Sequence, residues 1–294
     1  AMAAASIDEA LRNAVCVGVD LDLIAGLDNF CWPDPVESAK TPDGRYKLAQ
    51  LVRANRALDD VCRAYNLPCI SGKDSMKNDA TLHGEKISIP PTILFSLIGN
   101  HSDVRKAVSS DFKSVEDRVY LCGESHQELG ASELAYMLRE QIDGVSGIGG
   151  RVPEIDTERN LAMYRALTTA MGEGLIASAH DCSDGGLAAA VAECCFGADA
   201  GANIDVSKIM GDCTEINSWG ALFGESLGRI LVSIEPQHCA TFEAAMHGHA
   251  CYALGEVEAG DKISITNGDE TILTASISSL RTAWKGALDG GGPQ

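Results

Sequence analysis

The chain has 294 residues, 45% of them hydrophobic, enough to bury the core of one large domain or of two ordinary ones. Its 23 basic and 42 acidic residues give a formal charge of −19, and so negative a surface repels nucleic-acid phosphates and anionic lipid headgroups. We therefore expect no nucleic acid and no membrane among its partners. An anionic metabolite remains compatible with this charge where Mg²⁺, lysines and helix N-termini hold it.

Composition also indicates the fold class and the compartment. Aromatic residues are scarce at 5% and glycines are plentiful at 30, which favours close helix-on-sheet packing and an α/β fold. The 11 cysteines are an odd number with no C-x-x-C spacing, as expected of reduced and mostly buried thiols. No apolar run reaches the ~18 residues of a membrane span, and the first residues lack the pattern of a signal peptide. These features predict a cytoplasmic protein.

In the first part of the chain, predicted helices and strands are separated by turn-rich segments. The pattern at residues 8–15 predicts a short amphipathic helix, and the apolar period at 47–67 predicts a longer one. Prolines and glycine exclude regular structure from much of the segment at 27–46. A short strand at 69–71 then leads into a loop that Gly72 opens.

Residues 77–86 resemble a polar hairpin, and 87–100 are rich in β-forming residues, with a double proline that belongs at an edge or bend. We place a domain boundary near Asp111, so that residues 1–111 form one domain and residues 112–294 the other.

The second part of the chain predicts a β-α-loop-α-β order followed by a strand-rich tail. The expected elements are a strand at 118–123, helices at 132–141 and 157–172 around a glycine-rich linker at 144–156, a strand at 175–181, a helix at 187–197, a helix and a strand within 218–234, and two short strands within 253–277 around an Asn-Gly turn.

The strongest candidate for chemistry is the junction of a predicted strand and helix around Asp181. Asp181 and Asp184 offer the oxygen ligands that Mg²⁺ prefers, and Ser183 adds a hydroxyl. Gly185 and Gly186 let a phosphate approach the backbone at a helix N-terminus, where free N–H groups favour negative charge. The structural alternative is an Asp/Ser helix cap with a tight turn and no ligand.

A second candidate is the Gly-Lys-Asp-Ser loop after the strand at 69–71. Lys73, Asp74 and Ser75 put a cation, a carboxylate and a hydroxyl side by side, which suits a phosphate, a metal and a substrate oxygen. The loop lacks the spacing of a P-loop, and an ordinary turn is the alternative.

The remaining candidates are weaker. Asp28 follows an apolar stretch, where an aspartate commonly forms a turn, and Glu225 has the alternative of an ordinary charge at the end of an element. The loop at 123–132 is either phosphate-facing or a helix cap. We favour a hydrogen-bonded structural role for His180 over that of a general base. No Ser/His/Asp or Cys/His spacing predicts a covalent nucleophile.

Six motifs occur in an order that resembles the second half of the phosphoribosylformylglycinamidine synthases of the long, single-chain type. They span roughly residues 7–285 and are DEALRN, LDNFCWP, ISGKDSM, SIPPTILFSLIG, SAHDCSDGGLAAAVAE and LFGESLGRILV. The resemblance implies the AIR synthetase-like (PurM-like) fold, in which an N-terminal α/β domain joins its sheet to a partner's to form a barrel and a C-terminal α/β domain follows. The boundary near Asp111 agrees with that division.

The resemblance also implies roles for particular residues. Asp181 corresponds to a magnesium ligand and Ser183 to an ATP contact at an auxiliary nucleotide site. Asp28 and Gly72 match ATP contacts of the catalytic site, and Ser75 matches a substrate contact.

One departure from the family pattern concerns metal binding. Lys73 stands where the short type of the synthase has a metal-binding asparagine, and Asp74 beside it is the candidate replacement. The resemblance assigns no catalytic residue here, because the histidine-bearing segment that the family places in its first unit is not in this sequence.

In the family reaction, ATP phosphorylates the amide oxygen of formylglycinamide ribonucleotide and ammonia then displaces the phosphate. We therefore expect ATP and Mg²⁺ as cofactors. The expected partners are the missing first half of the synthase or a second copy of this chain, and a glutaminase domain as ammonia source. On this hypothesis the chain is part of an ATP-dependent carbon–nitrogen ligase and is inactive alone. Two alternatives stay open: a non-catalytic nucleotide-binding scaffold, and an autonomous kinase or synthetase of the same superfamily.

Overall fold

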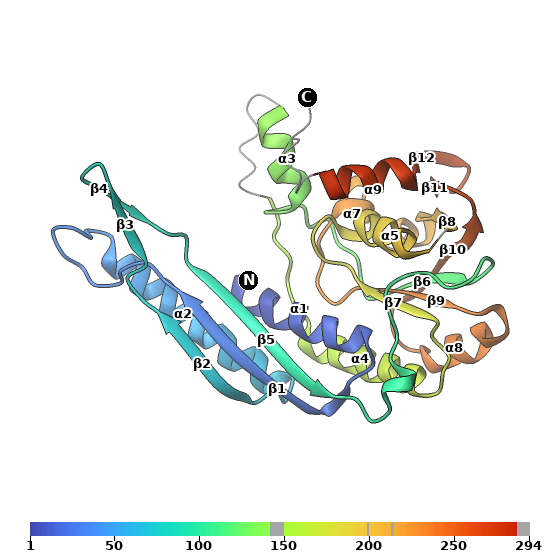
Figure 1. Ribbon diagram of the computed structural model, residues 1–294, viewed down its shortest axis with the longest axis horizontal. Coiled ribbons are helices and arrows are strands. Elements are labelled where there is room, and N and C mark those ends of the chain that lie inside the picture. Colours follow the sequence, from blue (N-terminus) through green and yellow to red (C-terminus); the bar gives the residue numbers. More distant parts are fainter. Residues whose placement is uncertain (142–149, 199, 213–214, 287–294) are drawn as a thin grey trace.

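The computed structural model describes residues 1–141, 150–198, 200–212 and 215–286, and its mixed α/β architecture confirms the predicted fold class. A three-stranded sheet with its helices forms an N-terminal arm, residues 1–100, and a seven-stranded sheet forms the centre of a larger body, residues 118–286 (Figure 1). The division into domains at Asp111 stays a prediction.

The arm is built from two helices and five strands. They are α1 (Met2–Cys16), β1 (Asp20–Cys31), α2 (Gly44–Ala64), β2 (Cys69–Ser75), β3 (Asp79–Leu82), β4 (Glu85–Ser88) and β5 (Thr92–Asn100). The sheet order is β2-β1-β5, with β2 parallel and β5 antiparallel to the central β1. Helices α1 and α2 pack on one face of this sheet, and β3 and β4 form a hairpin at its far end (Figure 1). The other face is open, with Leu94 60% and Ile98 67% exposed.

The body carries the remaining elements in chain order. After a short connection that contains η1 (Val104–Lys106), they are β6 (Arg118–Cys122), α3 (Glu133–Gln141), α4 (Thr157–Gly172), β7 (Ser178–Asp181), α5 (Gly186–Gly197), β8 (Ala200–Asp205), α6 (Ser207–Asp212), α7 (Ser218–Phe223), β9 (Ile230–Ile234), η2 (Pro236–His238), α8 (Cys239–Ala245), β10 (Cys251–Ala259), β11 (Lys262–Asn267), β12 (Glu270–Ser276) and α9 (Ile277–Gly286).

The body sheet has the order β12-β11-β8-β10-β6-β9-β7 and is covered on both faces. Helices α5, α7 and α9 lie on one face and α4 and α8 on the other (Figure 1). Because side chains alternate along a strand, Tyr120 and Cys122 of β6 join the core beneath α4 and α8, while Val119 and Leu121 join the core beneath α5. Within the described ranges, no helix combines the length and the apolarity needed to cross a bilayer.

Helix α1 joins the arm to the body. Ile7, Leu11 and Val15 recur at a spacing of four and are completely buried, so they form one apolar stripe along the helix. This stripe belongs to a single core cluster that also contains Phe95 of the arm and Tyr164 of the body. The helix predicted at 8–15 is confirmed as the second half of the longer α1.

Two segments predicted as irregular are strands instead. Residues 27–31 complete β1, and Gly72 to Ser75 complete β2. Both predictions were wrong because β1 is hydrogen-bonded along both edges, and this pairing extends to Cys31 opposite Ser75. The prolines that suggested an irregular segment come after the end of β1.

Most other element predictions are confirmed with shifted ends. Helix α2 begins earlier and ends earlier than the predicted 47–67, whereas α4 coincides with the predicted 157–172. The tail has three strands where two were expected, because the predicted segment also contains most of β10. The linker expected at 144–156 lies partly outside the described residues.

Candidate functional site

The acidic turn predicted around Asp181 lies where β7 passes into α5, next to α1. The carboxylate of Asp181 at the end of β7 accepts a hydrogen bond from the hydroxyl of Ser183. Arg12 on α1 donates from a terminal guanidinium nitrogen to the same hydroxyl oxygen at 3.2 Å. The structure thus brings together two predicted residues, Asp181 and Ser183, and adds Arg12 from the other end of the chain.

The charges around Asp181 fix its protonation and that of His180. Burial raises the pKa of Asp181, but hydrogen bonds from His180 and Ser183 and the charge of Arg12 lower it below its usual value overall. Burial lowers the pKa of His180, yet its contacts with Asp181 (3.4 Å) and Glu193 (2.9 Å) raise it to about 9. Near pH 7 Asp181 is therefore an ionised carboxylate and His180 a protonated imidazolium. A protonated His180 has no free nitrogen lone pair and cannot accept a proton, in agreement with its predicted structural role.

Glu9 on α1 is a neighbour of this turn that the sequence did not single out. Burial raises its pKa, and the charges of Asp184 and Asp181 raise it further against the opposing effect of Arg12. Partial burial is the largest cause of this shift, and the smaller effects of Asp184 and Asp181 put their charges in the neighbourhood of Glu9. The signal that points to Glu9 is its place on α1 beside Asp8 and one turn before Arg12, polar residues on a helix whose apolar stripe is buried.

The two glycines of the turn serve packing as well as backbone access. The N–H of Gly185 donates to Glu225 Oε1 at 3.0 Å, and the same oxygen accepts the N–H of Glu133 at 2.9 Å. The Glu225 carboxylate therefore links the start of α5 to the start of α3 like a clamp. Burial raises the pKa of Glu225. Gly186 has φ +64°, and a Cβ there would lie 2.5 Å from the carbonyl oxygen of Gly224, so only glycine fits without a shift.

A buried polar cluster beneath the turn explains how Arg12 is held. Asp8 is completely buried and forms an ion pair with Arg12, which is 2% exposed. Asp8 Oδ1 accepts the hydroxyls of Tyr65 at 2.5 Å and Tyr164 at 2.9 Å. Its other oxygen accepts the N–H of Gly228 at 3.2 Å. We call these five residues, together with Asn160, whose amide donates to Asp8 at 3.3 Å, the Asp8 cluster.

The residues predicted on the arm form two smaller groups. Asp28 lies opposite Gly72 in the β1–β2 register, and a Cβ on Gly72 would lie 3.0 Å from Asp28 Oδ1, so the glycine makes room for this carboxylate. The ammonium group of Lys73 contacts the hydroxyl of Ser75. Because side chains alternate, Asp74 lies on the sheet face of Gly72 and not on that of Lys73 and Ser75. In Figure 1 the end of β2 lies away from β7, so the structure does not join these residues to the acidic turn within one copy of the chain.

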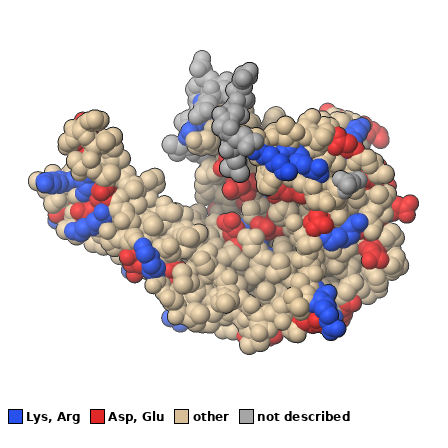
Figure 2. Space-filling view, viewed as in Figure 1, with Lys and Arg blue, Asp and Glu red and all other residues tan. Residues whose placement is uncertain are grey.

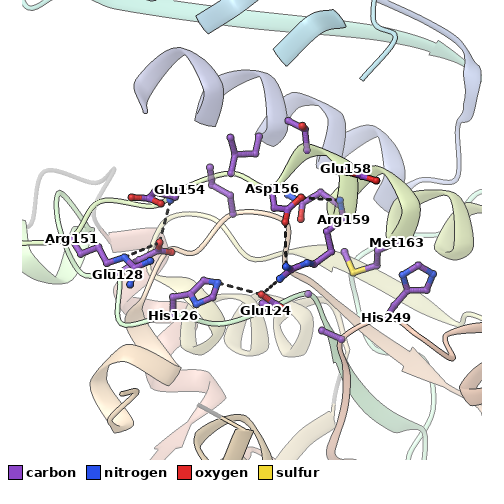
Figure 3. A pocket seen from close by; sticks show the side chains of 16 residues that line it. Glu124, His126, Glu128, Arg151, Glu154, Asp156, Glu158, Arg159, Met163 and His249 are labelled. Atoms are coloured by element: carbon purple, nitrogen blue, oxygen red, sulfur yellow. Dashed lines mark hydrogen bonds and ion pairs between the residues drawn. The ribbon is translucent and has the colours of Figure 1, made fainter. Parts of the chain in front are cut away.

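A cavity of about 580 Å³ lies at the N-terminal end of α4 (Figure 3). Several of its charged side chains pair with one another. Arg159 contacts the carboxylate of Glu124 and lies 3.3 Å from Asp156, the residue that caps α4. Arg151 Nε lies 3.7 Å from Glu128. Ion pairs therefore line part of this cavity.

The loop at 123–132, which was a candidate for phosphate binding, forms one side of that cavity. It contributes the carboxylates of Glu124 and Glu128, and Glu128 is completely buried. The hydroxyl of Ser132 accepts the N–H of Ala135 at 3.2 Å in the first turn of α3. Carboxylates repel phosphate, and Ser132 is a helix cap, so the structural alternative describes this loop better.

The surroundings of the acidic turn suit a divalent cation bound together with phosphate. Figure 2 shows acidic side chains in the recess between the arm and the body. In the part of the chain that the structure describes, no three Asp, Glu, His or Cys side chains converge closely enough to hold a metal alone. A Mg²⁺ ion here would complete its shell with water and phosphate oxygens, as Mg²⁺ commonly does with nucleotides. Arg12 Nε, buried and without a hydrogen-bond partner, adds positive charge beside Ser183.

The family of the chain follows from its second half. The model of the family described as AIR synthase related protein, C-terminal domain, matches residues 114–267, which are 154 of the 294 residues. The chain belongs to the AIR synthase related family. Its predicted likeness to the AIR synthetase-like superfamily is thereby confirmed.

Solved structures share the fold of this AIR synthase related chain at low sequence identity. T. maritima PurL complexed with FGAR matches with a TM-score of 0.72 and 16% identity, over 95% of this chain and 42% of that chain. Phosphoribosylformylglycinamidine synthase II from Thermotoga maritima gives 0.69 and 15%, over 95% and 41%. Hydrogenase maturation protein HypE in complex with ATP gives 0.63 and 13%, over 93% and 78%. The AIR synthase related chain thus spans about 42% of the length of the PurL protein.

Proposed function

We propose that this chain is the second synthetase unit of a phosphoribosylformylglycinamidine synthase. In that role it takes part in the ATP-dependent conversion of formylglycinamide ribonucleotide to its amidine, in the cytoplasm. The likeness of fold along 95% of the chain to T. maritima PurL, whose structures include complexes with FGAR and with ATP, supports the proposal. The six sequence motifs support it independently.

The observation that carries the proposal is the convergence of α1 on the acidic turn. Asp181 is a carboxylate at neutral pH, Glu9 lies near it, and Arg12 reaches Ser183. Asp181 and Glu9 would hold Mg²⁺, while Ser183 and the guanidinium of Arg12 would face the phosphates. This turn corresponds by resemblance to the auxiliary nucleotide site, where Mg²⁺ would partly neutralise the charge of the bound phosphates. The clamp formed by Glu225 keeps the turn in place and leaves the phosphates to side chains rather than to the N–H of Gly185.

The arm has a separate part in this proposal. Lys73 and Ser75 lie on the open face of the sheet, the face available to the first half of the synthase or to a second copy of the chain. We place the formylglycinamide ribonucleotide site at that junction, near Ser75, the residue that the resemblance gives as a substrate contact, whereas Gly72, Asp74 and Asp28 lie on the other face of the sheet. Ammonia would come from a glutaminase partner. The chain alone is then expected to bind nucleotide without completing the reaction.

Calorimetry with Mg²⁺–ATP tests the nucleotide site. We expect Asp181→Asn to weaken binding at least about tenfold, since it removes a charge that holds the metal. Asp205→Asn is the matched control, because Asp205 also ends a strand and bonds the hydroxyl of a serine two residues on, Ser207 Oγ at 2.8 Å. Equal affinities for the two variants would refute the assignment of Asp181.

A reconstitution experiment tests the reaction itself. The first half of such a synthase, added to this chain with ATP, formylglycinamide ribonucleotide and ammonium, should restore phosphate release above the rate of either part alone. Tight nucleotide binding without any such rescue would instead support the non-catalytic scaffold.

An autonomous ATP-dependent enzyme is the second candidate. The match to HypE in complex with ATP includes 93% of this chain and 78% of that protein. Proteins of nearly this size therefore share the fold. This candidate predicts ATP hydrolysis by the purified chain alone in the presence of a small acceptor. Absence of turnover alone, together with rescue by the first half, would exclude it.

A further inference from the structure

Two cysteines face each other where α2 is followed by β2. Cys62 lies in the last turn of α2, Cys69 is the first residue of β2, and their Sγ atoms are 3.8 Å apart. A disulfide holds its sulfur atoms about 2.05 Å apart. The two thiols therefore need to approach by less than about 2 Å, a movement within the range of side-chain rotation.

A cavity open to solvent lies beside the two cysteines. Cys62 and Cys69 line the same cavity of about 660 Å³, which also contacts Asp22, Asp59 and Pro68. Cys69 is an exposed residue, whereas Cys62 is 7% exposed. A small oxidant in the cavity thus meets Cys69 first and finds Cys62 directly behind it.

We propose that Cys62 and Cys69 form a reversible disulfide with a peroxide as oxidant. The thiolate of Cys69 attacks one oxygen of hydrogen peroxide, the O–O bond breaks, and a sulfenic acid forms as hydroxide leaves. The sulfur of Cys62 then attacks the sulfenic sulfur, an S–S bond forms, and the hydroxyl leaves as water with the thiol proton. Two thiols lose two electrons in total, and one peroxide becomes two waters.

The order of the two steps follows from the surroundings of each sulfur. Burial and, after it, the neighbouring Cys69 together raise the pKa of Cys62 to about 12. At neutral pH Cys62 is therefore a protonated thiol that reacts poorly with peroxide in solution. It is suited to the second step, because the sulfenic sulfur of Cys69 is held next to it.

A bridge at this place would fix the start of β2 to the end of α2. The closed loop contains Tyr65, which donates to Asp8 in the Asp8 cluster, and Pro68, whose carbonyl oxygen accepts the N–H of Gly26 at 2.8 Å. Closing so short a loop restricts mainly the unfolded chain and should raise the melting temperature by roughly 5 °C. The proposal does not depend on the function proposed above.

The chain contains a matched control pair. Cys122 and Cys251 lie opposite each other on β6 and β10 with their Sγ atoms 3.7 Å apart. Cys122 is completely buried, and Cys251 is half-buried and lines a cavity. Sulfur separation is thus the same as in the proposed pair, while access differs. We expect no bridge there in the folded protein.

Peptide mapping after mild oxidation tests the proposal. The purified chain is treated with a small excess of hydrogen peroxide, remaining thiols are alkylated with iodoacetamide, and the digest is analysed by mass spectrometry without reductant. We expect a Cys62–Cys69 cross-link with the mass of two hydrogens lost, reversed by dithiothreitol. In Cys69→Ser the cross-link and the gain in melting temperature should both vanish, and in Cys251→Ser both should remain.

Other results would overturn the assignment. In Cys62→Ser, dimedone should trap a sulfenic acid at Cys69, and absence of that adduct refutes the first step. A Cys69 found only as sulfinic acid, or an oxidised Cys69 beside an alkylated Cys62, refutes the second. Because Cys69 is exposed, Cys69→Ser is expected to fold, so the comparison stands even where Cys62→Ser is unstable.

Discussion

Replacing Asp8 with alanine should destabilise the protein more than any other single change to a charged residue discussed above. Asp8 is completely buried and, among the residues that the structure describes, is the one carboxylate that forms an ion pair with Arg12. Without it, the buried Arg12 guanidinium has no carboxylate in direct contact, which costs about 3–5 kcal/mol. The hydroxyls of Tyr65 and Tyr164 and the N–H of Gly228 also lose their acceptor, at about 1 kcal/mol or more each.

These contributions overlap, so we expect a loss of roughly 4–7 kcal/mol in the free energy of unfolding. Domains are stable by only about 5–15 kcal/mol, and Asp8→Ala should accordingly be partly unfolded or insoluble near 37 °C. The milder Tyr65→Phe removes one hydrogen bond to a charged acceptor and should lose about 1.5–3 kcal/mol.

Urea unfolding followed by tryptophan fluorescence measures these losses. Trp32 is buried in the arm, whereas Trp219 and Trp284 belong to the body, so the signal reports on both parts. A double-mutant cycle with Asp8→Leu and Arg12→Met isolates the ion pair, and the double variant should be at least about 2 kcal/mol more stable than the sum of the single losses predicts. A loss below about 1 kcal/mol for Asp8→Ala, or additive losses in the cycle, would refute the reasoning.

Three further changes test other parts of the structure. The double change Leu94→Lys and Ile98→Lys should abolish self-association through the open face of the arm, as measured by sedimentation. Val104→Lys, at another exposed apolar side chain, should leave self-association unchanged. Association that survives the double change would show that another surface is used. Burial raises the pKa of Asp205, but hydrogen bonds lower it overall, so the ionised side chain stabilises the fold above about pH 4 and this effect is lost as the pH falls. The difference in unfolding free energy between the unchanged protein and Asp205→Asn should therefore shrink on acidification. A difference that stays constant with pH would contradict this. Gly186→Ala should lower the free energy of unfolding by about 2–4 kcal/mol, because φ is +64° and the nearest carbonyl oxygen would lie 2.5 Å from the new Cβ. An unchanged urea midpoint would show that the turn can move to make room.

Elements with local signals were predictable from the sequence. Helix α4 has an apolar period, and the side chain of Asp156 before it accepts the N–H of Arg159 at 3.0 Å as a helix cap. The residues next to the start of the helix are therefore enough to predict where it begins. The strand status of Gly72 to Ser75 was not predictable in this way. Their composition favours a turn, and only the pairing with β1, a partner distant in sequence, makes them a strand.

The same distinction applies to the candidate site. Asp181 and Ser183 were found because a strand end, an acidic pair and two glycines occur together in one short segment. Glu225 was weighed but its role was not foreseen, since its carboxylate reaches the turn from another loop. Glu9 and Arg12 come from α1, and nothing local to the acidic turn indicates that this helix would pack there.

The contacts of Arg12 connect the stability of the protein to the geometry of its candidate site. One side of the guanidinium is fixed by Asp8 in the Asp8 cluster, and another nitrogen donates to Ser183 in the acidic turn. Because Asp8 is held in turn by residues of both the arm and the body, the position of Ser183 depends on how α1 sits between them. A partner that binds the arm can therefore affect the acidic turn without touching it, provided that it shifts α1. We therefore expect changes at Asp8, Tyr65 or Tyr164, which contact no ligand in the proposed site, to lower nucleotide affinity and unfolding free energy together.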